Sequence, residues 1–371
     1  MRAQLIVLLG VIGLLLAACG GGDGGDVAGD VAGDDGDTAP ADDGGDDGAA
    51  AAQPGEGVSV TMGRANWDTG YMQSHVFKQL LEELGYSVSD PSAQELGPAQ
   101  YYPALAQGES DFWVNGWFPL HDPMFETELP TGETVGDKVS KVGFEVEAGA
   151  LQGYLVDKKT ADELGITSMS DFNDPEIAAV FDDNGNGTAD LMGCDDGWGC
   201  NATINTHLEQ LEWGDSVEQI VGSYSALMAD VVARVERGEP ALFYTWTPNW
   251  TVDVLKPGGD VVWIESPELP EEEGQTSVPG LAGCVTEDCQ MGWTPNDIRV
   301  VASNEFLEAN PAAAQLFELV EIPLEAIAEQ NGRMNAADSY SEAQIAEDAS
   351  AWIEANRDLV DGWLEEARAA T

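Results

Sequence analysis

Apolar and polar residues follow one another along this chain in two patterns, one typical of strands and one of helices. Residues 58–62 alternate with a period of two, and residues 73–84 place their apolar side chains on one helical face ahead of Gly85. Similar patterns predict strands at 86–88, 111–114, 151–156, 241–244, 260–264 and 298–302, and helices at 102–105, 158–164, 217–220, 225–237, from Pro311 onward and from Ser341 onward. Strands that alternate with helices indicate an α/β protein. Residues 267–293 are rich in Gly, Pro and Glu and are expected to form a long loop.

The first eighteen residues are typical of an export signal. Met1 and Arg2 precede an apolar run at 5–16 that is too short to span a membrane. Leu-Ala-Ala directly before Cys19 resembles the bacterial lipobox, which predicts that residues 1–18 are a lipoprotein signal peptide and that Cys19 carries the lipid. The alternative is an ordinary signal peptide with a chance cysteine. We expect a protein anchored to the outer face of the cytoplasmic membrane, or a periplasmic one if the cell has an outer membrane.

Composition divides the rest of the chain. Residues 19–57 consist almost entirely of Gly, Asp, Ala and Pro, cannot bury enough apolar surface to fold, and are expected to form a disordered acidic tether. The remainder is long enough for two α/β lobes. We expect residues 58–149 in the first lobe and 150–270 in the second. Residues 271–371 are expected to return to the first lobe, with the acidic cysteine-containing loop and the C-terminal helices.

The net charge of the chain and the absence of catalytic sequence motifs limit the classes of function that it can have. The chain has 68 acidic and 14 basic residues, a net charge of −54, so nucleic acid and anionic lipid surfaces are poor partners. Such acidity suggests a protein that works in salt, where screening weakens self-repulsion. No Gly-x-Ser-x-Gly elbow, His-Glu-x-x-His helix or P-loop occurs. We expect a monomeric binding protein without a cofactor, not an enzyme; a two-carboxylate glycosidase and a sugar-binding lectin are the alternatives.

Four cysteines besides Cys19 form two close pairs, Cys194 with Cys200 and Cys284 with Cys289. In an oxidising compartment close pairs favour disulfides that close small loops. A zinc site is the competing interpretation, but neither pair has C-x2-C spacing and the chain has only three histidines.

One acidic loop has oxygen donors at alternate positions and a glycine where a calcium loop would turn. Its candidate ligands are Asp182, Asn184, Asn186 and Asp190. The closing glutamate of a calcium loop is absent, because position twelve is Gly193. The loop is therefore a weak calcium candidate, and a polar turn is the better interpretation.

Three tryptophans are expected in polar loops flanked by Gly or Pro, namely Trp117, Trp198 and Trp246. Trp198 lies between two glycines inside the predicted Cys194–Cys200 loop, where it has little core to pack into. Several indole faces together suit a quaternary ammonium, which cannot donate hydrogen bonds but is attracted to the ring quadrupole. Packing within a lobe or at its rim is the alternative for each tryptophan taken alone.

The segments around these tryptophans resemble a known family. The specific matches are residues 117–122 (Trp-Phe-Pro-Leu-His-Asp), 193–200 (Gly-Cys-Asp-Asp-Gly-Trp-Gly-Cys) and 243–248 (Phe-Tyr-Thr-Trp-Thr-Pro), followed by 256–263. From about Val58 to its end the chain resembles the glycine betaine/proline betaine-binding proteins of ABC osmoprotectant importers. The pair Cys284 and Cys289 departs from the family pattern.

The resemblance implies a two-lobed, type II periplasmic-binding-protein (venus flytrap) fold that closes on a ligand and delivers it to an ABC permease and its ATPase. It implies that Trp117, Trp198 and Trp246 surround the methylated ammonium. It also implies that His121 and the backbone amides of Gly199 and Cys200 hold the carboxylate; a structural hydrogen bond is the alternative for His121. Trp67 is a fourth wall or an ordinary lobe residue, and Tyr71, Trp113 and Tyr244 are weaker candidates. Glycine betaine or proline betaine is the expected ligand, with carnitine and choline as alternatives.

Overall fold

The structure, a computed structural model, describes residues 52–337 and 339–370. The predicted signal peptide, Cys19 and the predicted tether up to residue 51 lie outside the described residues. Residues 52–57, which we expected in the disordered tether, instead form a turn in which the N–H of Gly55 donates to the carbonyl of Leu84 (2.9 Å). The tether prediction is wrong for these six residues. Within the described residues, no helix is long and apolar enough to cross a membrane.

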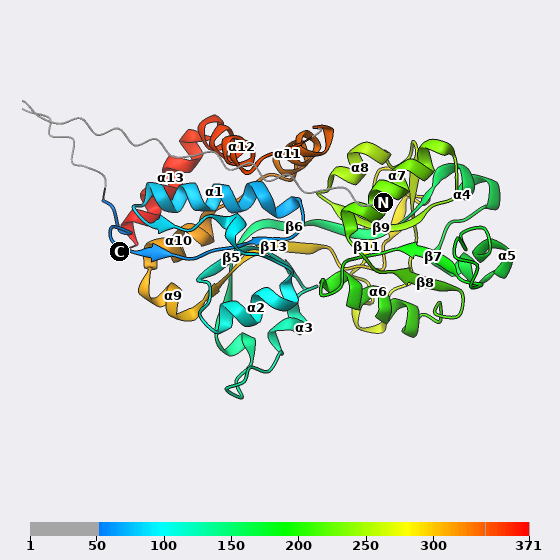
Figure 1. Cartoon of the computed structure of the whole chain (residues 1–371), viewed down its shortest axis with the longest axis horizontal. Helices are drawn as coiled ribbons and strands as arrows, with labels where there is room; N and C mark the ends of the chain where they lie inside the picture. The colour runs from blue at the N-terminus through cyan, green and yellow to red at the C-terminus, as the bar shows by residue number, and fades with distance from the viewer. Residues whose placement is uncertain (1–51, 338, 371) are drawn as a thin grey trace, which may run out of the picture. The chain divides into compact units, whose positions relative to one another are not determined.

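The largest sheet of the described residues has seven strands and runs through both lobes (Figure 1). Its order is β5-β13-β6-β9-β7-β8, with β10 also paired to β6. The bounds are β5 Phe112–Phe118, β6 Val139–Asp157, β7 Ala189–Met192, β8 Val217–Ile220, β9 Leu242–Thr247, β10 Val261–Ile264 and β13 Asn296–Ser303. The expected α/β class is confirmed.

Strand β6 connects the two lobes. Its first part pairs antiparallel with β13 up to the Asn296–Ala150 pair, and its second part pairs with β9 from the Leu151–Thr247 pair onward. The strand expected at 151–156 is present, but it starts twelve residues earlier, at Val139. The lobe boundary that we expected after residue 149 therefore lies inside one continuous strand.

The first lobe covers its part of the sheet with helices from both ends of the chain (Figure 1). Helix α1 (Thr69–Glu83) lies against β5, and its apolar positions Val76, Phe77, Leu80 and Leu81 are buried as the pattern predicts. The other helices of this lobe are α2 Pro98–Ala106, α3 Asp122–Phe125, α9 Asn304–Ala309, α10 Pro311–Leu319, α11 Leu324–Ala336, α12 Glu342–Ala355 and α13 Arg357–Ala369. The capping box predicted at Ser341 is confirmed at the start of α12. Two-residue strands form two small parallel pairs, β1 (Ser59–Val60) with β3 (Ser87–Val88) and β2 (Arg64–Ala65) with β4 (Glu95–Leu96).

The second lobe is built on β7, β8, β9 and β10. Its helices are α4 Lys158–Leu164, α5 Pro175–Ala178, α6 Gly199–Gln210, α7 Tyr224–Arg237 and α8 Trp250–Leu255. The helix predicted at 217–220 is wrong, because these residues form β8, parallel to β7. Four residues are too few to distinguish a helical period from a strand, and here the pairing with β7 decides the outcome.

The expected long loop at 267–293 contains a hairpin, β11 (Ser277–Pro279) with β12 (Asp288–Gln290). It lies against β10, where the N–H of Val285 donates to the carbonyl of Trp263 (3.1 Å). This segment, which we assigned to the first lobe, thus contacts a strand of the second. The two predicted disulfides, Cys194–Cys200 and Cys284–Cys289, are both confirmed.

Candidate functional site

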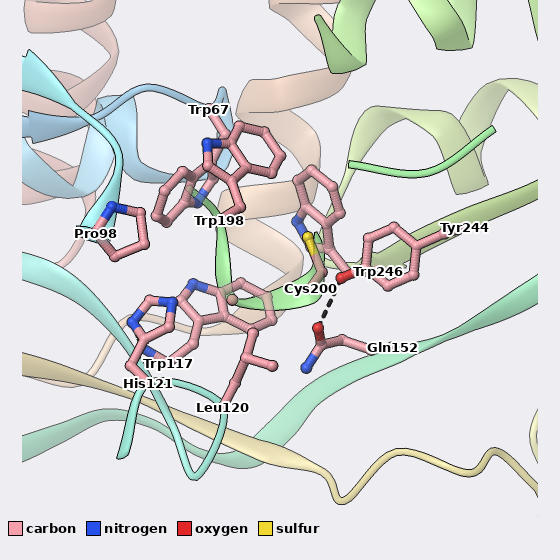
Figure 2. A pocket seen from close by; sticks show the side chains of 11 residues that line it. Trp67, Pro98, Trp117, Leu120, His121, Gln152, Trp198, Cys200, Tyr244 and Trp246 are labelled. Carbon is pink, nitrogen blue, oxygen red and sulfur yellow. Dashed lines mark hydrogen bonds between the residues drawn. The ribbon is translucent and has the colours of Figure 1, made fainter. Parts of the chain in front are cut away.

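A cavity with an empty volume of about 320 Å³ lies between the two lobes (Figure 2). The first lobe contributes Trp67, Pro98, Trp117, Leu120 and His121. The second part of β6 and the second lobe contribute Gln152, Trp198, Gly199, Cys200, Tyr244 and Trp246. All seven residues that the sequence predicts as ligand-binding therefore line one cavity.

Two of the tryptophans are held by strands and one by a loop. We expected Trp117 and Trp246 in polar loops, but Trp117 belongs to β5 and Trp246 to β9. Both strands keep their pairing up to the cleft, so the two rings are fixed by the sheet. Trp198 does lie in the predicted disulfide loop, as the residue directly before helix α6.

The four tryptophans form a chain of neighbouring rings across the cavity. Ring centroids are 5.2 Å apart for Trp67 and Trp198, 5.8 Å for Trp198 and Trp246, and 6.4 Å for Trp117 and Trp246, all with edge-to-face geometry. Edge-to-face contacts are favourable for aromatic pairs and leave some ring faces open. Tyr244 adds a further ring, 6.0 Å from Trp246.

Each of these four indole N–H groups donates to an acceptor in the first lobe. Trp67 and Trp117 both donate to Oδ1 of Asn115, at 2.7 and 3.0 Å. Asn115 is fully buried, and its own Nδ2 donates to Gln73. One amide oxygen therefore orients two walls of the cavity.

The two tryptophans of the second lobe donate across the cleft. Trp198 donates to Oδ1 of Asn66 (2.9 Å), and Trp246 donates to Oγ1 of Thr69 (3.0 Å). The same Thr69 hydroxyl donates to the carbonyl of Pro248 (2.8 Å). These contacts hold the two lobes against each other around the cavity.

His121 has one ring nitrogen engaged by the protein. The main-chain N–H of Trp117 donates to Nδ1 (3.1 Å), and the hydroxyl of Tyr102 lies 2.7 Å from the same atom. An N–H can only donate, so Nδ1 is unprotonated and the neutral ring carries its proton on Nε2. Burial lowers the pKa of His121 to about 3. The residue is therefore a neutral ring whose Nε2–H has no partner among the described residues.

Helix α6 starts at the cavity. Gly199 and Cys200 are its first two residues, and neither backbone N–H has an intrahelical acceptor at this position. The helix dipole places partial positive charge at this end. A Cβ on Gly199 would lie 2.8 Å from Leu120 and 3.2 Å from His121, so glycine permits the first lobe to approach the helix end.

The remaining candidates lie elsewhere. Trp113 stacks on Tyr101 in the core behind Trp67 and does not line the cavity; nor does Tyr71, whose ring lies under Arg64. In the acidic loop, Asp182 accepts from the N–H groups of three residues of the loop itself, as in a polar turn. Among the described residues, no three His, Cys, Asp or Glu side chains are grouped so as to hold a metal ion.

Several residues at the site were not predicted from the sequence. Asn66, Thr69 and Asn115 orient tryptophans, and Gln152 and Leu120 line the cavity. A lone polar residue in an apolar strand is the one signal for Gln152. The partners of the indole N–H groups come from distant segments, so no local pattern reveals them.

Comparison with known proteins places this chain in a family. The family of the substrate binding domain of ABC-type glycine betaine transport systems matches residues 58–355. The glycine betaine/proline betaine-binding periplasmic protein of Salmonella typhimurium is 40% identical over 326 residues, covering 86% of this chain and 93% of that protein. The glycine betaine-binding periplasmic protein OusX of Dickeya dadantii is 39% identical, covering 85% of this chain and 92% of that protein.

Solved structures agree on the fold. A glycine betaine, L-proline-binding protein (ProX) from Borrelia burgdorferi superposes with a TM-score of 0.63 at 18% identity, covering 84% of this chain and 99% of that one. The lactococcal OpuAC in its closed-liganded conformation has a TM-score of 0.59 at 17% identity, covering 83% and 99%. The expected two-lobed periplasmic-binding-protein fold is confirmed. The chain belongs to the family of substrate-binding domains of ABC-type glycine betaine transport systems.

Proposed function

We propose that this protein captures glycine betaine, or the similar proline betaine, outside the cell and delivers it to an ABC permease for osmoprotection. Family membership supports the transport role, and the curated relatives are named for these two ligands. The observation that carries the ligand assignment is the chemistry of the cavity. It has aromatic faces from four tryptophans together with a helix N-terminus and a neutral histidine. These two features suit a small zwitterion that bears a methylated ammonium and a carboxylate.

The aromatic part would hold the ammonium. All four indole N–H groups already donate to protein acceptors, so Trp67, Trp117, Trp198 and Trp246 offer the ligand their π-faces. A quaternary ammonium has no hydrogen-bond donor of its own and is attracted to such faces by about 0.5–2 kcal/mol per contact. In this proposal Trp67 is the fourth wall of the box.

The start of α6 would hold the carboxylate. The N–H groups of Gly199 and Cys200 point out of a helix N-terminus, which favours an anion. His121 would add a donor from the first lobe through Nε2–H. Choline lacks a carboxylate and cannot use these donors, whereas carnitine has one but is longer. The donor set therefore favours glycine betaine and proline betaine over choline.

Transport would follow from lobe closure. Trp67, Trp117 and His121 come from the first lobe, and Trp198, Trp246 and the α6 amides from the second. A ligand that contacts both sets stabilises the closed form, and that form would dock on the permease. We further propose that the protein is exported and held at the membrane by a lipid on Cys19, and that it works as a monomer; the N-terminal sequence pattern supports the anchor.

Calorimetric titration tests the function. The chain with Cys19→Ser, which removes the proposed lipid site, would be titrated in parallel with glycine betaine, choline and carnitine. We expect glycine betaine to bind, and we expect Trp198→Ala to weaken its binding about 2- to 30-fold, the equivalent of one lost cation–π contact. The matched control is Trp352→Phe, because Trp352 packs on Trp363 in the first lobe and does not line the cavity. Folded protein that binds none of the three ligands would refute the proposal.

A further inference from the structure

The side chain of Gln152 has one buried donor group without a hydrogen-bond partner in the described part of the chain. Gln152 lies on β6, two residues after the strand's last pair with β13, and it is only 2% exposed. Its Oε1 accepts from the hydroxyl of Tyr244 (2.6 Å), the bond drawn in Figure 2. Its Nε2 is buried and has no acceptor among the described residues.

The contact with Tyr244 fixes the orientation of this amide. Tyr244 is fully buried, and burial raises the pKa of its hydroxyl well above the usual value, so the group keeps its proton and donates. In this arrangement the oxygen of Gln152 accepts from that hydroxyl, and the NH₂ group points away from it. A buried N–H without an acceptor is unfavourable, so this group is expected to find one when the cavity is filled.

The position of Gln152 indicates which part of a ligand it faces. Gln152 and Leu120 line the main cavity and also an adjoining one, so the two side chains lie at the border between these spaces. Leu120 in turn lies beside Gly199, at the start of α6. Leu120 therefore connects this border of the cavity, which Gln152 also lines, with the free backbone N–H groups. Of the two charged groups of a betaine, only the carboxylate can accept from an N–H.

We propose that Gln152 is a specificity-determining residue whose Nε2 donates to the carboxylate of the bound betaine. The α6 amides and His121 are the other donors to the carboxylate. Gln152 adds a further donor, which comes from the strand that joins the two lobes. It thereby raises the preference for carboxylate-bearing ligands over choline, which carries a hydroxyl instead. This inference rests on the proposed function.

The test is Gln152→Glu in the chain with Cys19→Ser, titrated at pH 8 with glycine betaine and choline. The substitution keeps the shape and the acceptor for Tyr244 but replaces the free donor with an acceptor. We expect the affinity ratio of glycine betaine to choline to fall about tenfold or more. Gln152→Met, which removes the donor without adding a charge, is expected to lower the same ratio by a smaller factor. Gln107→Glu makes the same change on an exposed side chain of the first lobe and is expected to leave the ratio unchanged.

The affinity ratio of glycine betaine to choline distinguishes a donor role of Gln152 from a structural role. A substitution that only loosened the cavity would weaken the binding of both ligands to a similar degree. If wild-type protein binds glycine betaine but neither Gln152 variant changes the ratio, the inference is wrong and the proposed function stands. If wild-type protein binds no quaternary amine, the proposed function itself fails.

Discussion

At the scale of single residues, burial determines the charge of two histidines. His121 and His207 are at most 2% exposed, and each has Nδ1 beside a tyrosine hydroxyl at 2.7 Å. Desolvation disfavours the charged ring, and it lowers the pKa of His121 to about 3 and that of His207 to about 4. Neither ring is therefore a cation at neutral pH, and in the proposed site His121 would contact the carboxylate only as a neutral donor.

A pH series checks the charge of His121. We expect its ring to stay neutral and protonated on Nε2 from pH 8 to pH 5, as seen in imidazole ¹⁵N shifts, and the affinity for glycine betaine to stay constant between pH 8 and 6. The same pKa shifts make the stability of the folded protein depend on pH. In the unfolded chain a histidine takes up a proton below about pH 6.5, whereas His121 and His207 in the folded protein do not. The contribution of the two rings to stability is therefore complete above that pH and is lost as pH falls toward 4 and 3. A protonation step of the ring near pH 6.5 would contradict the assignment.

The residues of the site were predictable to different degrees. Trp117, Trp198, Trp246 and His121 stand in short, distinctive segments, and family resemblance identifies them. Asn115 lies in the same stretch, yet nothing in the sequence shows that it accepts from two tryptophans, because one of them, Trp67, is 48 positions away. Hydrogen-bond partners depend on how distant segments pack, which a local pattern does not contain.

At the scale of elements, the start of α6 is placed where the two lobes meet. Its first residue, Gly199, contacts Leu120 and His121 of the opposite lobe so closely that a methyl group would overlap Leu120. A side chain at this position would therefore require Leu120 to move before the first lobe could approach the helix end this closely.

Gly199→Ala tests this close approach. We expect the affinity for glycine betaine to fall about tenfold or more, because the added methyl group keeps the lobes apart, while the melting temperature of the ligand-free protein changes little. The matched control is Gly222→Ala, since a Cβ at Gly222 would meet no atom within 4 Å. Unchanged affinity in Gly199→Ala would mean that the first lobe does not need to approach this end of α6.

Helices and strands with a regular apolar pattern were predicted correctly from the sequence, and irregular ones were missed. Helices α1 and α7 have clear apolar faces, and α1, α4 and α7 each have glycine at or just after their ends. Each of the three lies within a few residues of its prediction. The first part of β6 was missed because its alternation is broken. Gly143 and Ala148 have positive φ, and the pairing with β13 shifts register twice. Such irregularities remove the period of two on which strand prediction depends.

At the scale of the whole molecule, charge is the dominant feature. The net charge of −54 at neutral pH makes the folded chain repel itself. A betaine is neutral overall, so this charge does not select the ligand. The net charge instead affects the stability of the folded protein.

We expect the melting temperature to rise by several degrees when NaCl is raised from about 0.1 M to molar concentration, because the Debye length falls from roughly 10 Å to 3 Å. Differential scanning calorimetry in a series of NaCl concentrations measures this. An equal osmolality of an uncharged solute is the control for effects other than screening. A melting temperature that stays flat or falls would contradict adaptation to salt.

The tryptophans of the second lobe also form contacts between the two lobes. Trp198 and Trp246 line the cavity and also donate across the cleft, to Asn66 and Thr69. In the proposed function, capture of the ligand and contact between the lobes would therefore use the same side chains.

The chain of four indoles also has an optical consequence. Rings whose centroids are 5.2 to 6.4 Å apart couple their electronic transitions strongly, and two of the three pairs join rings of opposite lobes. When the lobes separate, that coupling is lost. The ultraviolet circular dichroism and the fluorescence of this protein should therefore contain an intrinsic, label-free signal of lobe opening, located at the site itself.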